Sequence, residues 1–225
     1  MSSQNIVTID GPGGAGKSTL AKLLAGKLGW AFLDTGAIYR TVALVLIERG
    51  LTEASDEEAG RIADQLDLSF RLEGHEQRLY LAGRNLGVAI RTPEVTKLAS
   101  RISSLPAVRT ALLSAQRRLG ERGQLVTEGR DMGTVVFPGA KLKFFLDADP
   151  EIRAKRRFDE LKAKSAQVPF CEVLAELKAR DQRDQNRTTA PLTRAPEAVV
   201  IDSSQLSQTE VFDLLYEKTK EVFNL

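Results

Sequence analysis

Short runs of hydrophobic residues alternate along the chain with longer segments in which hydrophobic residues recur every three or four positions. The short runs indicate buried strands, and the longer segments indicate helices with one apolar face. Strands that alternate with helices are typical of a parallel sheet covered by helical crossovers. We therefore predict an α/β fold with a five-stranded parallel sheet and helices on both faces. The predicted strands are 6–10, 31–34, 124–128, 142–147 and 198–202, and the predicted helices are 17–28, 37–48, one beginning at Thr92-Pro93, 107–119, 150–164, 170–187 and 209–223.

The stretch from 66 to 91 breaks this rhythm. Every second residue from Leu66 to Leu72 is apolar, which is the pattern of a strand with one solvated face. Two further runs follow at 78–81 and 86–90, each preceded by a glycine within a few residues. We predict a small antiparallel sheet here, inserted into a helical crossover of a single domain.

The composition is that of a globular protein, with 225 residues, 42% hydrophobic and 28% charged. Such a chain is long enough for one domain, 1–225, with its own core. The single cysteine, Cys171, cannot form an internal disulfide, which favours a reducing compartment. No apolar run approaches the ~20 residues of a membrane helix, and residues 1–5 lack the pattern of a secretion signal. We expect a soluble, cytoplasmic monomer without a membrane partner.

Charge is nearly balanced over the whole chain, at +2, but not along it. The segment 150–194 holds 11 basic and 7 acidic residues, and seven of the basic ones are arginines, which suit phosphate. Because acids are interspersed among them, we expect no nucleic-acid partner. The chain has a single histidine, His75, so a site built from several histidines is excluded.

A glycine-rich segment lies between the first predicted strand and the first predicted helix. It satisfies the phosphate-loop pattern G-x-x-x-x-G-K-[ST]. It also satisfies the dinucleotide pattern G-x-G-x-x-G, and Asp34 lies near the distance at which a ribose-binding acid is found. A glycine turn without a ligand is the third interpretation. The residues of the segment are Gly11, Pro12, Gly13, Gly14, Ala15, Gly16, Lys17, Ser18 and Thr19.

Lys17 and Ser18 favour the phosphate loop. A dinucleotide's pyrophosphate is held by backbone N–H groups and needs no lysine. In a phosphate loop, Lys17, which we expect to be exposed, would reach the β- and γ-phosphates, and the Ser18 hydroxyl would bind Mg²⁺. Glu128 would hold the water shell of that ion or act as a capping carboxylate. The chain lacks the Asn-Lys-x-Asp signature of guanine-binding GTPases, so a small kinase that uses Mg²⁺ with ATP is the leading class.

Two further segments carry a resemblance to a known family. Residues 34–40 read Asp-Thr-Gly-Ala-Ile-Tyr-Arg, and residues 128–134 read Glu-Gly-Arg-Asp-Met-Gly-Thr. With these segments the chain resembles the bacterial cytidylate kinases, which are nucleoside monophosphate kinases, over nearly its whole length. The resemblance implies a P-loop kinase fold in which 66–91 is an acceptor-binding insertion and 150–168 a helical lid. It also implies transfer of the γ-phosphoryl group of ATP to CMP or dCMP.

The resemblance further implies which residues bind the acceptor. Three arginines match those that hold its α-phosphate, and three residues match those that read the cytosine edge, where a carboxylate would accept from the N4 amine. For that carboxylate, an ion pair with a neighbouring arginine is the alternative. Two residues would reach the pentose, and Thr35 stands where the family often has serine. These residues are Arg40, Arg130 and Arg187 for the phosphate, Asp131, Arg109 and Ser100 for the base, and Arg180 and Asp184 for the pentose.

Arginines also open the predicted lid helix. Arg153, Arg156 and Arg157 have helical spacing, and in related kinases arginines here clamp the ATP phosphates during transfer. A charged, solvated helix face is the alternative. We predict that Arg153 and Arg157 act with Lys17 and Arg130 as the catalytic residues. No general base is required, because most of the acceptor phosphate is already dianionic at pH 7 and positioning and electrostatics lower the barrier.

Two other functions remain open at this point. An adenylate or shikimate kinase would share the phosphate loop, and the Gly-Arg-Asp-Met-Gly-Thr segment favours a cytidylate kinase over both. A nucleotide-dependent switch or a nucleic-acid-binding NTPase would instead use the basic residues of 150–194 on a phosphate backbone.

Overall fold

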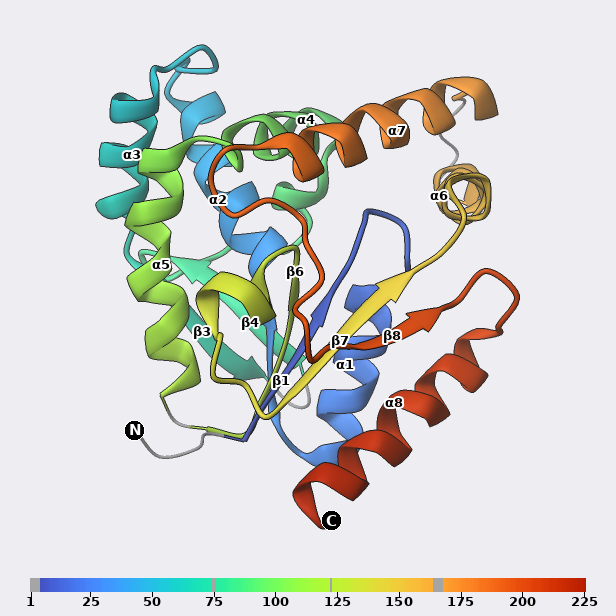
Figure 1. Ribbon diagram of the computed structural model, residues 1–225. Helices are drawn as coiled ribbons and strands as arrows, with labels where there is room; N and C mark the ends of the chain where they lie inside the picture. Colours follow the sequence, from blue (N-terminus) through green and yellow to red (C-terminus); the bar gives the residue numbers. More distant parts are fainter. Residues whose placement is uncertain (1–4, 74–75, 122, 164–167) are drawn as a thin grey trace.

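Five parallel strands form the central layer of the computed structural model, which describes residues 5–73, 76–121, 123–163 and 168–225 (Figure 1). Their order across the sheet is β2-β6-β1-β7-β8, and every neighbouring pair is parallel. The prediction of a five-stranded parallel sheet is confirmed, and each strand lies within a residue of its predicted bounds. The strands are β1 (Ile6–Asp10), β2 (Ala31–Asp34), β6 (Leu125–Gly129), β7 (Leu142–Asp147) and β8 (Val199–Asp202).

Helices cover both faces of this sheet (Figure 1). Successive strand residues point to opposite faces, so Ile6 joins a core with α2 to α5, while Val7 joins another with α1 and α8. The pair α6 and α7 pack together beyond the carboxyl end of β7. The helices are α1 (Lys17–Leu28), α2 (Thr35–Glu48), α3 (Asp56–Asp64), α4 (Pro93–Ile102), α5 (Pro106–Gly120), α6 (Pro150–Ala163), α7 (Phe170–Asn186) and α8 (Gln208–Phe223).

One helix, α3, is absent from the predicted elements although its sequence carries a start signal. The Ser55 side chain accepts a hydrogen bond from the backbone N–H of Glu58, and acidic residues fill the first turn. Both features stabilise a helix N-terminus. The helix is short, and its apolar residues Ala59, Ile62 and Ala63 are few and mostly small among charged neighbours, so it does not stand out as an apolar segment.

A second, antiparallel sheet lies within 66–91, as predicted, with the strand order β3-β4-β5. Its strands are β3 (Leu68–Glu73), β4 (Glu76–Leu81) and β5 (Arg84–Asn85). The expectation that the 86–90 run belongs to this sheet is wrong. That run contains a turn and the start of a short 3₁₀ helix, η1 (Ala89–Arg91), because Leu86 and Ile90 are buried in the core shared with α2 and α4.

The only histidine, His75, lies outside the described residues. So does Lys164, the predicted last residue of the lid helix. Within the described parts of the chain, no helix is both long enough and apolar enough to span a membrane.

Candidate functional site

The glycine-rich segment forms the turn between β1 and α1, at the carboxyl end of the central strand of the sheet. A side chain at Gly11 is impossible, because its Cβ would lie 1.9 Å from the backbone oxygen of Leu146 on β7. Gly14 and Gly16 have φ of 77° and 91°, the left-handed conformation that favours glycine. The loop leads into the N-terminus of α1 at Lys17, where free backbone N–H groups form a natural anion site.

Lys17 is buried rather than exposed, which corrects the sequence-based expectation. Its side chain turns back over the loop, and Nζ donates a 2.6 Å hydrogen bond to the backbone oxygen of Pro12. Burial and the nearby positive charge of Arg130 lower the pKa of Lys17. Glu128 and Asp10 offset part of this effect, but the buried ammonium is still disfavoured, so an anion bound in the loop would stabilise its charged form.

Ser18 and Glu128 form the candidate magnesium site. The Ser18 hydroxyl donates a 2.8 Å hydrogen bond to the Glu128 carboxylate, which is buried at the end of β6. Burial and the charge of Asp34 raise the pKa of Glu128. A hydroxyl and a carboxylate side by side are hard oxygen donors of the type Mg²⁺ prefers, so these residues fit the ion.

Two arginines and one acid converge above the loop. The Arg130 Nε donates a 2.7 Å hydrogen bond to Asp184 on α7, and the Arg180 Nε lies 4.0 Å from the same carboxylate. Despite its burial, the pKa of Arg130 is raised by Asp184. Burial and the charge of Arg130 lower the pKa of Arg180 to about 10. The Asp184 carboxylate therefore faces two guanidinium groups. It offsets the cost of burying the charge of Arg130 more than that of Arg180.

A second cluster places Asp131 between two arginines. Arg109, from α5, donates to one oxygen of the Asp131 carboxylate, and Arg187, which follows α7, lies 3.2 Å from the other. All three side chains are buried. Tyr39 lies beneath them, with the Arg109 guanidinium 5.7 Å from its ring centre. The alternative of an ion pair for Asp131 is therefore realised in this structure, with Arg109 and Arg187 as the partners.

Arg40 and Ser100 each have a hydrogen-bond partner outside the Asp131 cluster. Arg40 donates a 2.8 Å hydrogen bond to Asp34, the residue that caps α2 through the N–H of Ala37. Ser100, on α4, accepts a 3.4 Å hydrogen bond from Arg183 of α7. Asp34 thus caps α2 and also accepts a hydrogen bond from Arg40. Ser100 links α4 to α7, the helix that carries Arg180 and Asp184.

The three arginines of α6 have different environments. Arg153 is buried and donates to Gly13 in the loop and, at 2.7 Å, to Asp181 on α7. Arg156 instead donates to the side-chain and backbone oxygens of Ser203, after β8. Arg157 is exposed and pairs with Glu160 on its own helix. The structure brings Arg153 to the phosphate loop and leaves Arg157 on the helix surface.

Comparisons with known proteins identify the family of the chain. Residues 7–221 match the family model for cytidylate kinase. The chain belongs to the cytidylate kinase family. It is 46% identical over 208 residues to cytidylate kinase 1 of Haemophilus influenzae, which covers 92% of this chain and 90% of that protein. It is 47% identical over 212 residues to the cytidylate kinase of Pasteurella multocida, which covers 94% and 93%.

A solved structure resembles this cytidylate kinase family member in fold alone. An uncharacterized protein from Eubacterium ventriosum aligns with a TM-score of 0.50 and 11% identity, over 97% of this chain and 99% of that one. The resemblance seen in the two sequence segments is confirmed by the family match, whereas the roles of single residues stay predictions.

Both glycines of the Gly-Arg-Asp-Met-Gly-Thr segment are required by close packing. A Cβ at Gly129 would lie 2.8 Å from Met132 and 3.0 Å from the Thr35 hydroxyl. At Gly133 it would lie 2.9 Å from the Thr8 hydroxyl and 3.0 Å from Lys143. The two glycines of this segment therefore allow its backbone to pack closely against its neighbours, while Arg130 and Asp131 supply its charged side chains.

Sequence reasoning missed Asp10 and Asp181. Asp10 ends β1, and its buried carboxylate accepts hydrogen bonds from the N–H groups of Met132 and Gly133. Asp181 is the partner of Arg153. An acid at the end of a buried strand, directly before the glycine loop, was a visible signal for Asp10. For Asp181, nothing local distinguishes it from the other charges of α7.

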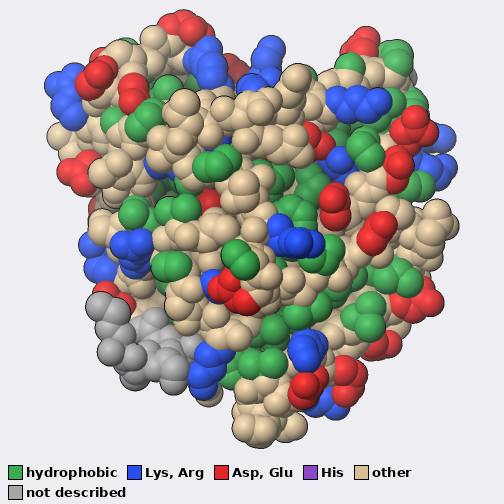
Figure 2. All heavy atoms as spheres, in the orientation of Figure 1, with side chains coloured by type: hydrophobic (Ala, Val, Ile, Leu, Met, Phe, Trp, Pro, Cys, Tyr) green, Lys and Arg blue, Asp and Glu red, His purple; other side chains and the backbone are tan. Residues whose placement is uncertain are grey.

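On the face of the molecule that Figure 2 shows, Lys and Arg side chains are interspersed with Asp and Glu side chains. Two cavities of about 750 and 360 Å³ lie along α8 and β8, with Leu206 and Leu214 in both linings. Neither of these two cavities is lined by a predicted site residue.

Proposed function

We propose that this chain transfers the γ-phosphoryl group of ATP to CMP or dCMP, giving ADP and CDP or dCDP. One observation carries the proposal beyond the family relationship. A Cβ built on Gly13 would lie 3.5 Å from Arg130 and 3.8 Å from Arg180. The loop for the donor phosphates and the arginines for the acceptor therefore meet at one point, as a direct transfer between two phosphates requires.

The donor side comprises the loop, Lys17 and Ser18. The backbone of 11–19 would bind the β-phosphate, and Lys17 would exchange its bond to Pro12 for the β- and γ-phosphates. Ser18 and Glu128 would hold Mg²⁺, directly or through water; the bound ion neutralises phosphate charge. The lowered pKa of Lys17 is consistent with this role, because an anionic ligand would restore its charged form.

Arg40, Arg130 and Arg187 would bind the α-phosphate of the acceptor. Each is paired with an acid here: Arg40 with Asp34, Arg130 with Asp184 and Arg187 with Asp131. These pairs hold the guanidiniums in place before the dianion arrives, which reduces the entropic cost of binding it. Arg130 would touch both phosphates and so act in the transfer itself.

Asp131 and Arg109 would read the base, with Ser100 at its edge. A carboxylate can only accept hydrogen bonds, so it suits the N4 amine of cytosine and disfavours the O4 oxygen of uracil. The pairing with Arg109 orients the Asp131 carboxylate.

Arg180 and Asp184 would bind the pentose. The Thr35 hydroxyl donates a 2.8 Å hydrogen bond to the backbone oxygen of Glu128, so it would meet a sugar hydroxyl only as an acceptor. We propose that Thr35 supports the wall of the pocket and that α7 contacts the sugar.

The transfer needs no general base on the protein. An oxygen of the acceptor phosphate attacks the γ-phosphorus, and the bond from that phosphorus to the β,γ-bridging oxygen breaks, leaving ADP. Lys17, Arg130 and Arg153 would stabilise the charge that spreads over the transferred group. Arg157 would join them only if the lid turned it away from Glu160.

Two segments would move during this cycle. Residues 150–168 would close as a lid, with Arg153 as its connection to the loop, and residues 66–91 would fold toward the acceptor. If so, CMP should protect the backbone amides of β3 and β4 from hydrogen exchange more than those of α8. Equal protection in both regions would make the insertion a static part of the fold.

The test of the proposed activity is ADP release with CMP, dCMP, UMP, AMP and GMP in turn, and then with shikimate. CMP and dCMP should be good acceptors, and AMP and GMP poor ones. Equal rates with AMP would indicate an adenylate kinase, and release only with shikimate would indicate a shikimate kinase. We further propose that the enzyme is a cytoplasmic monomer that binds neither nucleic acid nor membrane. Size-exclusion chromatography tests the oligomeric state, and an RNA mobility shift tests nucleic-acid binding.

A further inference from the structure

The segment that follows Asp131 is a single turn of π-helix, η2 (Met132–Val136). Its hydrogen bonds include a 3.1 Å bond from the Val136 N–H to the Asp131 oxygen and a 2.7 Å bond from the Phe137 N–H to the Met132 oxygen. Such turns are rare, and they need support from the surrounding structure. The position of Asp131 therefore depends on what holds this turn.

Asp10 holds the N-terminal end of the turn. Its two carboxylate oxygens each accept one backbone hydrogen bond, from Met132 at 2.8 Å and from Gly133 at 2.7 Å. The side chain is only 4% exposed. A negative charge at this end also suits the N–H groups that begin a helical turn, because they have no partner within the turn.

Arg117 holds the C-terminal end. This arginine belongs to α5, and its Nε and Nη2 donate to the backbone oxygens of Val136 and Val135 at 3.1 and 2.9 Å. The planar guanidinium fits two successive carbonyl groups at once, and its charge suits the carbonyl end of the turn. Arg117 itself lies on the exposed side of α5.

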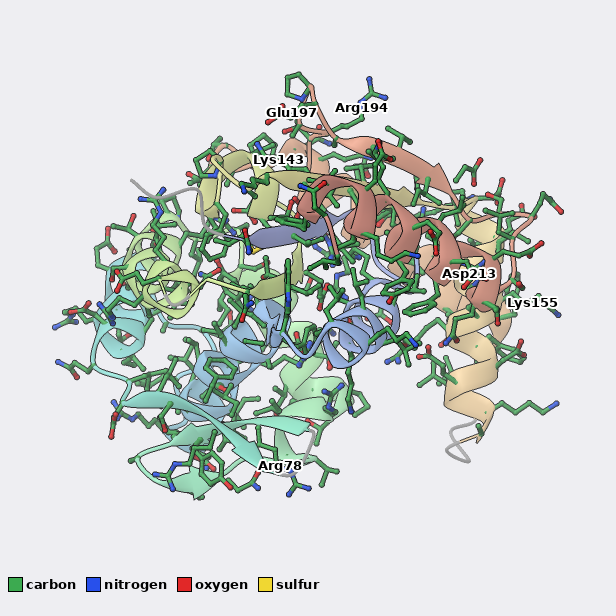
Figure 3. All side chains as sticks on the ribbon, turned by 90° about the horizontal axis from the view of Figure 1, so that it is seen from below. Arg78, Lys143, Lys155, Arg194, Glu197 and Asp213 are labelled. Atoms are coloured by element: carbon green, nitrogen blue, oxygen red, sulfur yellow. The ribbon has the colours of Figure 1, made fainter. Side chains whose placement is uncertain are left out.

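The sides of the turn are closed by packing. Gly133 sits against Thr8 of β1 and the stem of Lys143 of β7. The Lys143 Nζ donates 2.6 Å to the Pro138 oxygen, just beyond the turn, and pairs with Glu197, which lies beside it in Figure 3. The turn is thus fastened to three separate elements of the fold.

We propose that Asp10 and Arg117 clamp this turn from its two ends and thereby fix the carboxylate of Asp131, which makes Arg117 a positioning residue for the choice between cytosine and uracil. The inference rests on the proposed base-reading role of Asp131. Hydrogen bonds weaken steeply with misalignment. A loosened turn therefore lowers CMP efficiency more than UMP efficiency, since only cytosine receives a favourable bond from the carboxylate.

Three variants of α5 test the clamp. Arg117→Met removes both hydrogen bonds while keeping an unbranched side chain, and Arg117→Lys keeps the charge and one possible bond. Arg118→Met is the matched control, because Arg118 is exposed on the next position of α5 and no side-chain bond is seen for it among the described residues. Each variant is compared with the wild type by kcat/KM for CMP and for UMP.

Arg117→Met should lower the ratio of kcat/KM for CMP over UMP by about 3- to 10-fold, the range of one net hydrogen bond. Arg117→Lys should recover part of that ratio, and Arg118→Met should leave it unchanged. The KM for ATP should stay the same in all three. Hydrogen exchange gives a second readout: the amides of Met132 and Gly133 should exchange faster in Asp10→Asn, and the amides of Val136 and Phe137 should do so in Arg117→Met.

Asp131→Asn is measured alongside to separate two failures. If it changes the CMP-to-UMP ratio and Arg117→Met does not, the clamp is refuted while the base-reading role stands. If neither variant changes the ratio, the base-reading role and the clamp fall together. A fall in efficiency for both nucleotides by one common factor in Arg117→Met also overturns the inference, because it marks a general structural role.

Discussion

The Arg187 guanidinium lies 3.2 Å from the carboxylate of Asp131, so a predicted phosphate-binding residue and the predicted base-reading residue are bound to each other. They are 56 residues apart in the sequence and both are buried. With Arg109 on the other carboxylate oxygen, this pair would couple the predicted phosphate contact to the predicted base contact. A change at Asp131 should therefore affect more than the contact with the base.

Asp131→Asn should lower the ratio of kcat/KM for CMP over UMP by about 10- to 150-fold, which corresponds to one charge-assisted hydrogen bond. The amide can offer a donor to the O4 of uracil, which removes a repulsive contact. It should also lower the free energy of unfolding by roughly 1–3 kcal/mol, because two buried arginines lose their carboxylate. Steady-state kinetics with both nucleotides and urea denaturation check the two effects. A ratio that stays constant would mean that Asp131 only orients its arginines.

Lys17→Met should lower kcat by about 100- to 1000-fold, since it removes a cation from the transferred phosphoryl group. The same substitution should leave the free energy of unfolding unchanged or raise it in the absence of nucleotide. The reason is that burial and Arg130 already lower the pKa of Lys17, so its charged form is disfavoured in the empty site. Thermal unfolding without and with ATP measures this, and the stabilisation by ATP should be smaller in the variant. Near-normal turnover would place Lys17 away from the phosphates.

Gly133→Ala should destabilise the fold by roughly 1–3 kcal/mol, as overpacking of a tight core does. The added methyl group would meet the Thr8 hydroxyl at 2.9 Å and Lys143 at 3.0 Å. Gly139→Ala is the control, because a Cβ there meets no atom of the described residues within 4 Å. Chemical denaturation of both variants should show a loss for the first and a change within about 0.5 kcal/mol for the second. Equal stability would show that the turn shifts at no cost.

Asp10 should make the stability of the protein depend on pH. Burial raises its pKa from 3.8 to about 6, against the lowering effects of the two backbone hydrogen bonds and Lys17, while Asp131 raises it further. Between pH 4 and 6 the folded state then keeps a proton that the unfolded state releases. The folded state binds more protons, so stability falls as pH rises through this window and levels off above it.

This contribution is isolated by subtracting the unfolding free energy of the Asp10→Asn variant from that of the wild type. It should fall by roughly 2 kcal/mol from pH 4 to pH 7, because the slope of 1.36 kcal/mol per pH unit holds only between the two pKa values of 3.8 and about 6. Urea denaturation at unit pH steps measures it. A difference that is flat or rises with pH would mean that Asp10 is ionised at no cost in the folded state.

Local sequence was sufficient for most of the architecture. The five strands could be placed because each is a short apolar run, and the phosphate loop because glycine, lysine and serine stand at fixed spacing between a strand and a helix. The 86–90 run was misassigned for the same local reason: its apolar residues match a strand, but Leu86 and Ile90 are buried by α2 and α4, which lie elsewhere in the sequence.

The sequence by itself determined which charged residues are present and which motifs they belong to, and so the family and the chemistry to expect. Only the tertiary structure decided their partners. Asp10 binds the turn that begins 122 residues later, and Asp131 takes Arg109 and Arg187 rather than its neighbour Arg130. These pairings follow from how the strands and helices pack, because a carboxylate pairs with the cations that the fold brings within a few ångström, and sequence distance does not show which cations those are.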